Sequence, residues 1–399
     1  MLTNIIILIF VFAGMLSFFL LSPSFCSYLP KRQIFSPWNT TLIVWIIILT
    51  VYCFAHKELY AISQQFIICL TVWVLTFTTS SILGFILTPS YKKPKWSVCE
   101  KNVDIITIAT IILVPIAVYK AIQHAFLLGS PEDLFLTLRE QAIDPEQNQL
   151  GIVKYFVYVI NVMLIVELSR NKLRKWRLIL VIILCFLFFI ATMGKSTLFM
   201  YLFSGLYILY EKKKISLRPI IFGALFLILL IPTMYFLRGG SNTDTDTDTI
   251  INILMIYIIS SIVAFGYVSP HSSFVWGENI FRPFYNILNI LGLSSYTPQS
   301  TIQDFCYVPL PTNVYTVLSP FYKDFGESGI FIFALIEGLI IGIIYKYSKS
   351  GCNIVSYLYA YIFTMLVMQF FDELFFQGIS SILQIFLIIL FCHIKIKLK

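Results

Sequence analysis

The sequence predicts an all-α integral membrane protein that crosses the bilayer about eleven times. Of its 399 residues, 58% are hydrophobic and only 12% are charged, whereas a soluble domain carries about 25% charged residues. The apolar residues form blocks of about 16–24 residues, a length that crosses a hydrocarbon core of ~30 Å. Backbone groups in lipid must be satisfied within their own segment, so these blocks are expected to be helices.

We expect residues 1–399 to form one membrane domain. The first block has no basic region before it, so it is predicted to be a span and not a cleaved signal peptide. The predicted spans are 2–22, 40–55, 64–88, 104–122, 152–169, 178–193, 196–210, 219–237, 328–345, 352–371 and 379–394.

Basic residues define the expected orientation. The net charge is +8, and 20 of the 28 Lys and Arg residues fall in one alternating set of loops. Short loops rich in Lys and Arg stay in the cytoplasm. The C-terminus is therefore expected inside and the N-terminus outside. Because the basic residues lie in short loops between spans, the net charge does not indicate nucleic acid as a partner.

Residues 250–269 are apolar enough to form another span. A span there would reverse every later loop and place the C-terminal lysines outside. We therefore expect a re-entrant or in-plane segment on the outer face, which is tolerated where protein or a water-filled cavity surrounds it. The alternative is that one of the other short spans is wrong.

The outer face should carry the chemistry. It has a first loop, 123–150, and a much larger connection, 238–327, and long connections of this kind are usually functional. The acidic run Thr243–Thr249 within the large loop is expected to be solvated. The eight cysteines show no metal-type spacing, so neither a metal nor a cofactor is predicted.

The stretch Pro311–Gly329 precedes a span on the outer side and resembles the oligosaccharide repeat-unit polymerases, the Wzy-type O-antigen polymerases. The residues that carry the resemblance are Asn313, Val314, Tyr315, Thr316, Tyr322, Asp324, Phe325, Gly326 and Gly329. The rest of the chain is similar more loosely, through Arg139, the turn Gly194-Lys195 and Arg238. The family usually has Arg in the turn where this chain has Lys195.

The resemblance implies a glycosyltransferase in the inner membrane of a bacterium. Such enzymes move a growing glycan from undecaprenyl pyrophosphate onto a new carrier-linked repeat, and build O-antigen or a related surface polysaccharide. It implies an inverting, metal-independent reaction at the periplasmic face, with a chain-length regulator as a possible partner.

Four cations lie near span ends on the outer face, against the prevailing charge bias. An Arg side chain can hold a phosphate with two parallel hydrogen bonds, and positive charge there would stabilise the departing pyrophosphate. The alternative is that they are ordinary interfacial cations. The predicted pyrophosphate-binding residues are Arg139, Lys195, Arg238 and Arg282.

Asp324 is the predicted general base, because an acceptor hydroxyl must lose a proton as it attacks. With Arg139 and Arg238 it makes up the predicted catalytic set. The alternative for Asp324 is a structural role at a helix N-terminus. His271 and Glu278 are rival bases.

Sugar binding is predicted for Asn313, Tyr315, Tyr322 and His271, although tyrosines are also enriched at membrane interfaces for other reasons. Glu337 lies in the middle of the span 328–345, where a carboxyl is by default a functional candidate. The adjacent Asp372 and Glu373 are expected to form a solvated outer turn.

Two other functions fit the sequence. One is the ligase that transfers finished glycan to the lipid A core. The other is a flippase or transporter, which should place charges along a path near the bilayer midplane. Glu337 is the only clear mid-span charge, and no internal repeat of spans is visible, so the polymerase is favoured.

Overall fold

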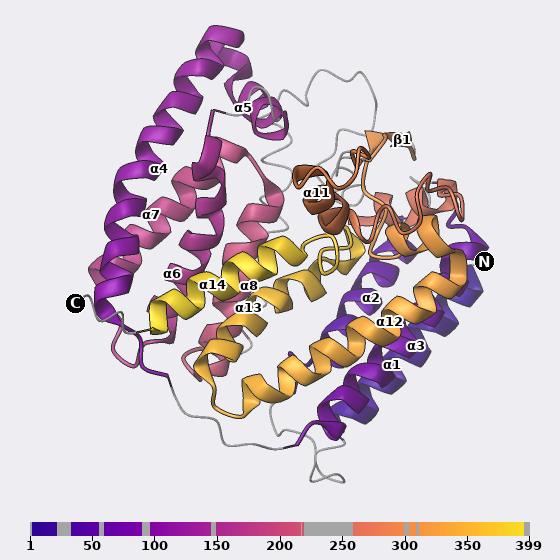
Figure 1. Ribbon diagram of the computed structural model, residues 1–399. Helices are drawn as coiled ribbons and strands as arrows, with labels where there is room; N and C mark the ends of the chain where they lie inside the picture. The colour runs from indigo at the N-terminus through magenta and orange to yellow at the C-terminus, as the bar shows by residue number, and fades with distance from the viewer. Residues whose placement is uncertain are drawn as a thin grey trace. The chain divides into compact units, whose positions relative to one another are not determined.

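A computed structural model describes most of the chain. The described residues are 2–21, 33–55, 60–89, 96–144, 149–216, 218, 258–298, 303–308 and 311–394. The predicted span 219–237, Arg238, Thr243–Thr249 and the first part of the predicted re-entrant segment lie outside them. The chain divides into two compact units: unit 1 is 1–93 with 251–382, and unit 2 is 94–250 with 383–399 (Figure 1).

Eight helices of the described ranges are long and apolar enough to span a membrane. They are α1 (Leu2–Leu21), α2 (Pro37–Ala55), α3 (Gln64–Leu87), α4 (Glu100–Leu128), α6 (Phe156–Ser169, preceded by η3, Gly151–Tyr155), α7 (Lys175–Thr192), α12 (Ser319–Lys349) and α13 (Asn353–Val367, followed by η6, Met368–Phe370). Shorter apolar helices are α8 (Lys195–Glu211), α14 (Ile379–His393) and Ile258–Tyr267, which ends in η5 (Phe265–Tyr267).

The prediction of an all-α polytopic membrane protein is confirmed. Ten of the eleven predicted spans coincide with helices, and the eleventh is 219–237. The remaining described elements are η2 (Pro131–Asp133), α5 (Leu134–Ile143), α11 (Arg282–Ile290) and an antiparallel hairpin of β1 (Cys306–Tyr307) and β2 (Pro311–Thr312). The helix Ile258–Tyr267 lies within the predicted re-entrant segment.

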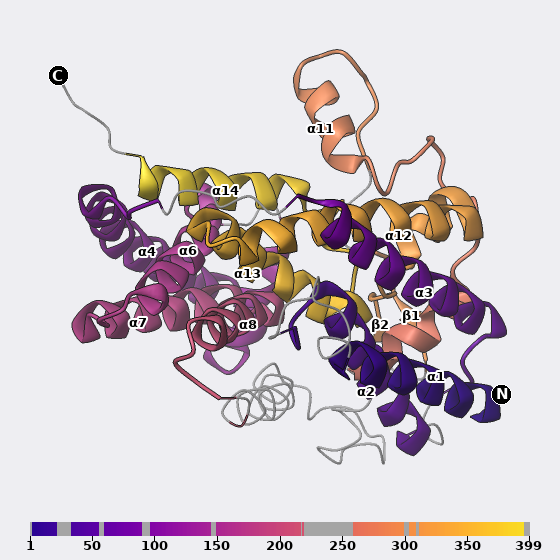
Figure 2. The ribbon, with the colours of Figure 1, turned by 90° about the horizontal axis from the view of Figure 1, so that it is seen from below.

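Unit 1 is built on the pair α3 and α12, which run side by side (Figures 1 and 2). Their backbones meet at glycines, as is common for membrane helices, where packing and not hydrophobicity drives association. A Cβ on Gly342 would lie 2.1 Å from the carbonyl oxygen of Ser81, and one on Gly84 would lie 2.4 Å from that of Leu339. Larger residues would force the two helices apart.

Helix α12 is broken at Gly326, whose φ of 62° and ψ of −148° are not helical. This region of backbone space is essentially restricted to glycine. The break separates a short N-terminal segment, Ser319–Phe325, from the part that pairs with α3. This segment contains Asp324, which contacts the loop 273–280.

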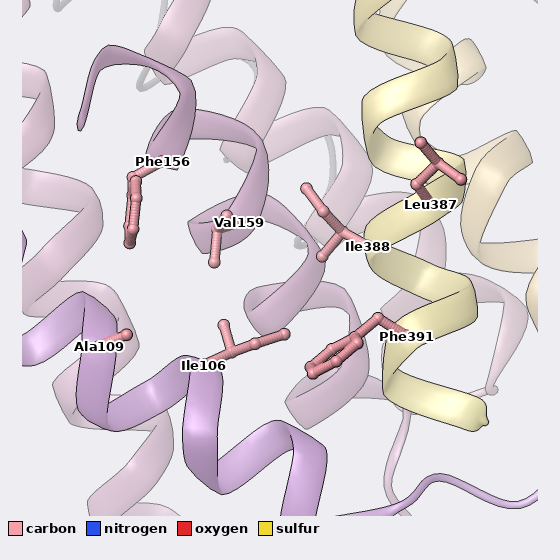
Figure 3. Close-up of a pocket in the computed structure, with 7 residues that line it drawn as sticks. All are labelled: Ile106, Ala109, Phe156, Val159, Leu387, Ile388 and Phe391. Carbon is pink, nitrogen blue, oxygen red and sulfur yellow. The ribbon is translucent and has the colours of Figure 1, made fainter. Parts of the chain in front are cut away.

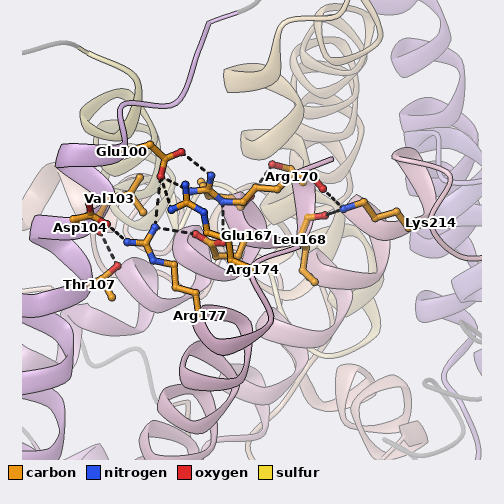
Figure 4. A network of polar contacts seen from close by, with 12 residues as sticks. Glu100, Val103, Asp104, Thr107, Glu167, Leu168, Arg170, Arg174, Arg177 and Lys214 are labelled. Atoms are coloured by element: carbon orange, nitrogen blue, oxygen red, sulfur yellow. Dashed lines mark hydrogen bonds and ion pairs between the residues drawn. The ribbon is translucent and has the colours of Figure 1, made fainter. Parts of the chain in front are cut away.

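In unit 2, α4, α6 and α7 meet in a network of ion pairs (Figure 4). Arg170 binds Glu100 with two hydrogen bonds, of 2.6 and 2.9 Å, and its Nε lies 2.8 Å from Glu167. Arg177 pairs with Asp104 and lies 3.5 Å from Glu167. Several arginines near the first residue of α7 are thus paired with carboxylates. In the sequence alone, these arginines counted only as positive charge.

Unit 2 also contains a cavity of ≈ 300 Å³ between α4, α6 and the last turns of α14 (Figure 3). Its lining is apolar and consists of Ile106, Ala109, Phe156, Val159, Leu387, Ile388 and Phe391. The Asn102 side-chain amide donates to the carbonyls of Phe391 (2.6 Å) and Ile394 (2.7 Å) and so ties α4 to the end of α14. A cavity without polar lining suits hydrocarbon and offers nothing to a sugar or a phosphate.

We expect Gly342→Ala to destabilise the protein. The added methyl group would meet backbone atoms of Ser81, and no side-chain rotation can relieve that clash. Overpacking of this kind costs about 1–3 kcal/mol. Thermal unfolding in detergent would measure it. Gly14→Ala in α1 is the matched control, because nothing lies within 4 Å of its Cβ position. Equal melting temperatures for both variants would contradict the close α3–α12 contact.

Candidate active site

Asp324 lies near the N-terminal end of α12 and holds the loop 273–280. Its Oδ1 accepts hydrogen bonds from the Ser273 hydroxyl, the Asn279 backbone (3.2 Å) and the Asn279 side chain (2.8 Å). Its Oδ2 accepts one from the backbone N–H of Ile280 (2.9 Å). The carboxylate is buried, and both oxygens are engaged. In this arrangement Asp324 positions the loop, and its role as a base stays a prediction.

Glu278 belongs to the same loop and is also buried. It accepts a hydrogen bond from the backbone N–H of Phe274 (3.2 Å) and another from the hydroxyl of Tyr296. Burial, followed by the hydrogen bond to Glu278, raises the pKa of Tyr296 to about 12. Tyr296 therefore stays protonated at neutral pH and remains a donor to this carboxylate.

Arg282, the first residue of α11, is buried among these acids. Burial lowers the pKa of its guanidinium, and the negative charges of Asp372, Glu278 and Asp324 act in the opposite direction. The negative charges of three carboxylates thus act on the predicted pyrophosphate-binding cation of unit 1. We call Glu278, Asp324, Asp372 and Glu373, together with Arg282, the carboxylate group.

Asp372 and Glu373 follow α13 and correct one expectation. They do not form a solvated turn, because Glu373 is only 1% exposed and Asp372 is half-buried. Glu373 accepts hydrogen bonds from the backbone N–H groups of residues 375 to 377, at 2.7–2.8 Å. Burial raises the pKa of each carboxyl to about 7. Asp372 also forms a β-bridge with Thr316, which belongs to the stretch 311–329 that carries the family resemblance.

The residues predicted to bind sugar lie around the same end of α12. Tyr315 is buried, and its hydroxyl donates to the carbonyl of Asp304 (2.6 Å). Tyr322 is buried with its ring 5.2 Å from that of Phe265, and Asn313 is half-buried.

His271 is exposed and covers the helix break. Its Nε2 lies 2.9 Å from the position that a Cβ would take on Gly326. The backbone N–H of His271 donates to the carbonyl of Tyr322 (3.4 Å). Of the predicted sugar-binding side chains, it is the one most open to a ligand.

In unit 2, Arg139 on α5 meets the turn between α7 and α8. Its Nη1 lies 3.8 Å from the Cβ position of Gly194, next to Lys195. Met193 has a left-handed φ of 44°, and no side chain caps the N-terminus of α8, where Lys195 is the first residue. We call Arg139 with residues 193–195 the cationic turn. It brings together two predicted cations that are 56 positions apart in the sequence.

The structure therefore sorts the predicted site residues into two sets. Unit 1 gathers Asp324, Arg282, His271, Tyr315 and Tyr322 near the N-terminal end of α12, and Asn313 lies two residues before Tyr315. Unit 2 gathers Arg139 and Lys195, while Arg238 lies outside the described residues. Sequence reasoning missed Ser273 and Asn279, the partners of Asp324, because nothing in the sequence pairs them with α12.

No group of three or more potential metal ligands occurs among the residues that the structure describes. The acidic residues around Arg282 are held by hydrogen bonds from backbone and side-chain donors, as described above.

Comparison with known proteins gives the family. A family described as "Putative O-antigen polymerase" matches residues 33–370. The chain belongs to the O-antigen polymerase family. An Escherichia coli (strain K12) protein of the same description is 25% identical over 390 residues, which cover 94% of this chain and 96% of that protein. The O-antigen polymerase of Shigella dysenteriae is 24% identical over 191 residues, covering 47% and 48%. No solved structure matches significantly.

The resemblance carried by residues 311–329 is thereby confirmed. As a member of the O-antigen polymerase family, the protein is a multi-pass membrane protein and, by reaction type, a glycosyltransferase-type polymerase. The matched range, 33–370, includes the cationic turn of unit 2. It also includes residues 33–93 and 251–370 of unit 1.

The pKa of Asp372 predicts a pH-dependent stability. The folded protein holds a proton with a pKa of about 7, against an ordinary value of 3.8. The stability that this group contributes is complete below about pH 4 and is lost as the pH rises through about 7. The melting temperature in detergent should therefore fall between mildly acidic and mildly alkaline buffer. Asp372→Asn should make this fall less steep, and Glu373, whose pKa is also about 7, supplies the slope that remains. Asp304→Asn, at an exposed carboxyl, should keep the slope; parallel curves for all three proteins would refute the assignment.

Proposed function

We propose that the protein joins undecaprenyl-pyrophosphate-linked oligosaccharide repeats into O-antigen or a related polysaccharide at the periplasmic face of the bacterial inner membrane. The observation that carries the proposal is the cationic turn, in which Arg139 approaches Gly194 and Lys195. Family membership supports the polymerase reaction. The lipid carrier and the side of the membrane rest on the chemistry that follows.

The cationic turn suits a pyrophosphate. The N-terminus of α8 has no side-chain cap, and backbone N–H groups at helix N-termini bind phosphate readily. Lys195 adds a compact positive charge, and Arg139 adds a planar fork that matches phosphate oxygens. A side chain at position 194 would crowd the turn, because its Cβ would lie only 3.1 Å from Thr197 Oγ1.

The proposed reaction is a single displacement. A hydroxyl of the acceptor sugar attacks the anomeric carbon of the donor, and the bond from that carbon to the pyrophosphate oxygen breaks. The electron pair leaves with the pyrophosphate, whose charge the cationic turn stabilises. The acceptor proton goes to a carboxylate. The anomeric centre inverts, and no metal or cofactor takes part in this scheme.

The carboxylate group of unit 1 supplies candidates for the base. Asp324 is retained as the first candidate. Because its oxygens already accept four hydrogen bonds, an acceptor hydroxyl would have to replace one donor, such as Ser273. Glu278 and Asp372 are the neighbouring alternatives, and Asp372 has a pKa close to neutrality, which favours proton exchange near pH 7.

The proposed sidedness is supported by the two ends of α7. The ion-pair network with Arg170, Arg174 and Arg177 lies near its first residue, Lys175, and the cationic turn follows its last residue, Thr192. Eighteen helical residues extend about 27 Å, close to the thickness of the hydrocarbon core. If the network is cytoplasmic by the positive-inside rule, the cationic turn is periplasmic. The N-terminus is then periplasmic and the C-terminus cytoplasmic.

Two experiments test the function against the ligase and the flippase. In a strain without this protein, surface glycan reduced to one repeat on the core indicates a polymerase. Carrier-linked polymer that never reaches the core indicates a ligase. Purified protein in detergent, given carrier-linked repeat, should extend chains, which excludes pure transport. A chain-length regulator is the proposed partner and can be added to the same assay.

Arg139→Ala should abolish polymer, because the pyrophosphate loses its bidentate partner. A loss on the order of 10²–10³-fold in rate is expected for one such donor, and Arg139→Lys should retain part of the activity. Polymer length in membranes with matched protein levels is the measurement. Lys172→Ala is the control, since this exposed cation lies beyond the other end of α7. Arg238→Ala is expected to behave like Arg139→Ala, and full-length polymer from both would defeat the pyrophosphate site.

The substitution Asp324→Asn tests whether Asp324 acts as the base or only anchors the loop 273–280. As the base, Asp324 should lose chain growth on this substitution while the loop 273–280 keeps its resistance to protease. If Asp324 serves only as an anchor, protease sensitivity and activity should change together. Glu278→Gln serves as the comparison within the same loop. Unchanged chain growth in Asp324→Asn would remove this residue from the mechanism.

A further inference from the structure

Helix α11 (Arg282–Ile290) has its polar and apolar sides reversed relative to a helix on a water-soluble surface. Its apolar residues Phe284, Ile287 and Ile290 are exposed, Ile290 by 82%. Its first residue, Arg282, is only 8% exposed. At 100° per residue, the apolar side chains share one side of the helix and the polar ones share the other.

The polar side of α11 is bonded to the protein. Tyr285 donates its hydroxyl to the carbonyl of Trp276 (2.7 Å), and the Asn289 amide donates to the carbonyl of Tyr296 (3.1 Å). Arg282 faces the charges of the carboxylate group. These contacts set the rotation of the helix, so the outward direction of its apolar side follows from them.

The exposed apolar surface extends beyond the helix. Leu291 and Leu293 are exposed after its end, and Phe274 and Trp276 are exposed before it. No charged residue occurs from position 283 to position 293. A contiguous apolar surface of this kind on a folded protein marks a membrane or protein contact.

The depth of α11 identifies its surroundings. Phe281, which precedes α11, has its ring 6.2 Å from that of Phe333. Phe333 lies seven residues beyond the break at Gly326, or about 10 Å into the spanning part of α12. Interfacial amphipathic helices sit with their apolar side about 5–10 Å below the headgroups. Figure 2 shows α11 projecting beyond α12, clear of the α3–α12 pair.

The neighbouring surface of α12 supports the same conclusion. Phe331, Ile332 and Leu335 of this span are exposed and apolar, as expected of side chains that face lipid. The apolar side of α11 thus adjoins a lipid-facing helix at the depth where acyl chains begin. A second protein is not needed to cover it.

We propose that α11 is an in-plane membrane anchor whose apolar side, formed by Phe284, Ile287, Ile290, Leu291 and Leu293, lies in the acyl chains of the leaflet at the Asp324 end of α12. The anchor holds Arg282 and the carboxylate group at the level of the lipid headgroups. The proposal rests on the membrane character of the chain and does not depend on the polymerase reaction.

Photo-crosslinking tests the anchor directly. The full-length protein would carry p-benzoylphenylalanine in place of Ile287 or Ile290, in vesicles of phosphatidylethanolamine and phosphatidylglycerol. Tyr285, a half-buried residue on the polar side of the same helix, is the matched control position. Mass spectrometry should show phospholipid adducts several-fold more abundant at the two Ile positions than at Tyr285. A fourth variant with the probe at Asn286 is treated in the same way. Equal adducts at Tyr285 and the two Ile positions, or cross-links to a second copy of the chain in place of lipid, would overturn the proposal.

A pair of substitutions gives a second readout that needs no probe. Ile290→Glu should lift the segment 283–293 from the leaflet and make it several-fold more sensitive to proteinase K added to the vesicles. Asn286→Glu places the same charge at an exposed polar position of the helix and should leave the cleavage rate unchanged. Equal cleavage of both variants would show that the two positions meet the same medium, and the anchor would be excluded.

Discussion

The break in α12 at Gly326 is the constraint on which the outer part of unit 1 depends. A continuous helix would carry Asp324 along the axis of the span and away from the large loop. The glycine backbone, with φ of 62°, turns the preceding segment so that Asp324 can accept hydrogen bonds from the loop 273–280. The Nε2 atom of His271 lies 2.9 Å from the Cβ position of Gly326, but this exposed side chain can rotate away, so the backbone conformation is what requires glycine.

The two units concentrate opposite charges. The outer end of unit 1 gathers carboxylates around one arginine, whereas the turn between α7 and α8 of unit 2 combines Arg139, Lys195 and an uncapped helix N-terminus. Each of these surroundings suits one requirement of the proposed glycosyl transfer. A carboxylate can accept the proton of the acceptor hydroxyl, and a positively charged turn can stabilise the leaving group as an anion.

The sequence predicted the helices well because their signal is long and simple. Long runs of apolar residues separated by charged loops placed ten spans. It also predicted the family from the stretch 311–329, where Gly326 has an absolute backbone requirement. The partners of Asp324 could not be predicted, because Ser273 and Asn279 are ordinary loop residues until the fold brings them to α12. The turn at Asp372 and Glu373 was misjudged for a related reason: polar residues between two apolar segments suggest solvent, but the chain folds back there to pair with Thr316.

The reversed polarity of α11 connects the fold to the depth of the site. Asp324 fixes the loop before α11 to the end of a span, and Phe281 packs against Phe333 within that span. Arg282 is the next residue along the chain, so its position relative to the bilayer is set by contacts on both sides of it. Burial within the protein raises the pKa of Asp372 to about 7, because the loss of hydration outweighs the nearby positive charges of Arg282 and Lys323.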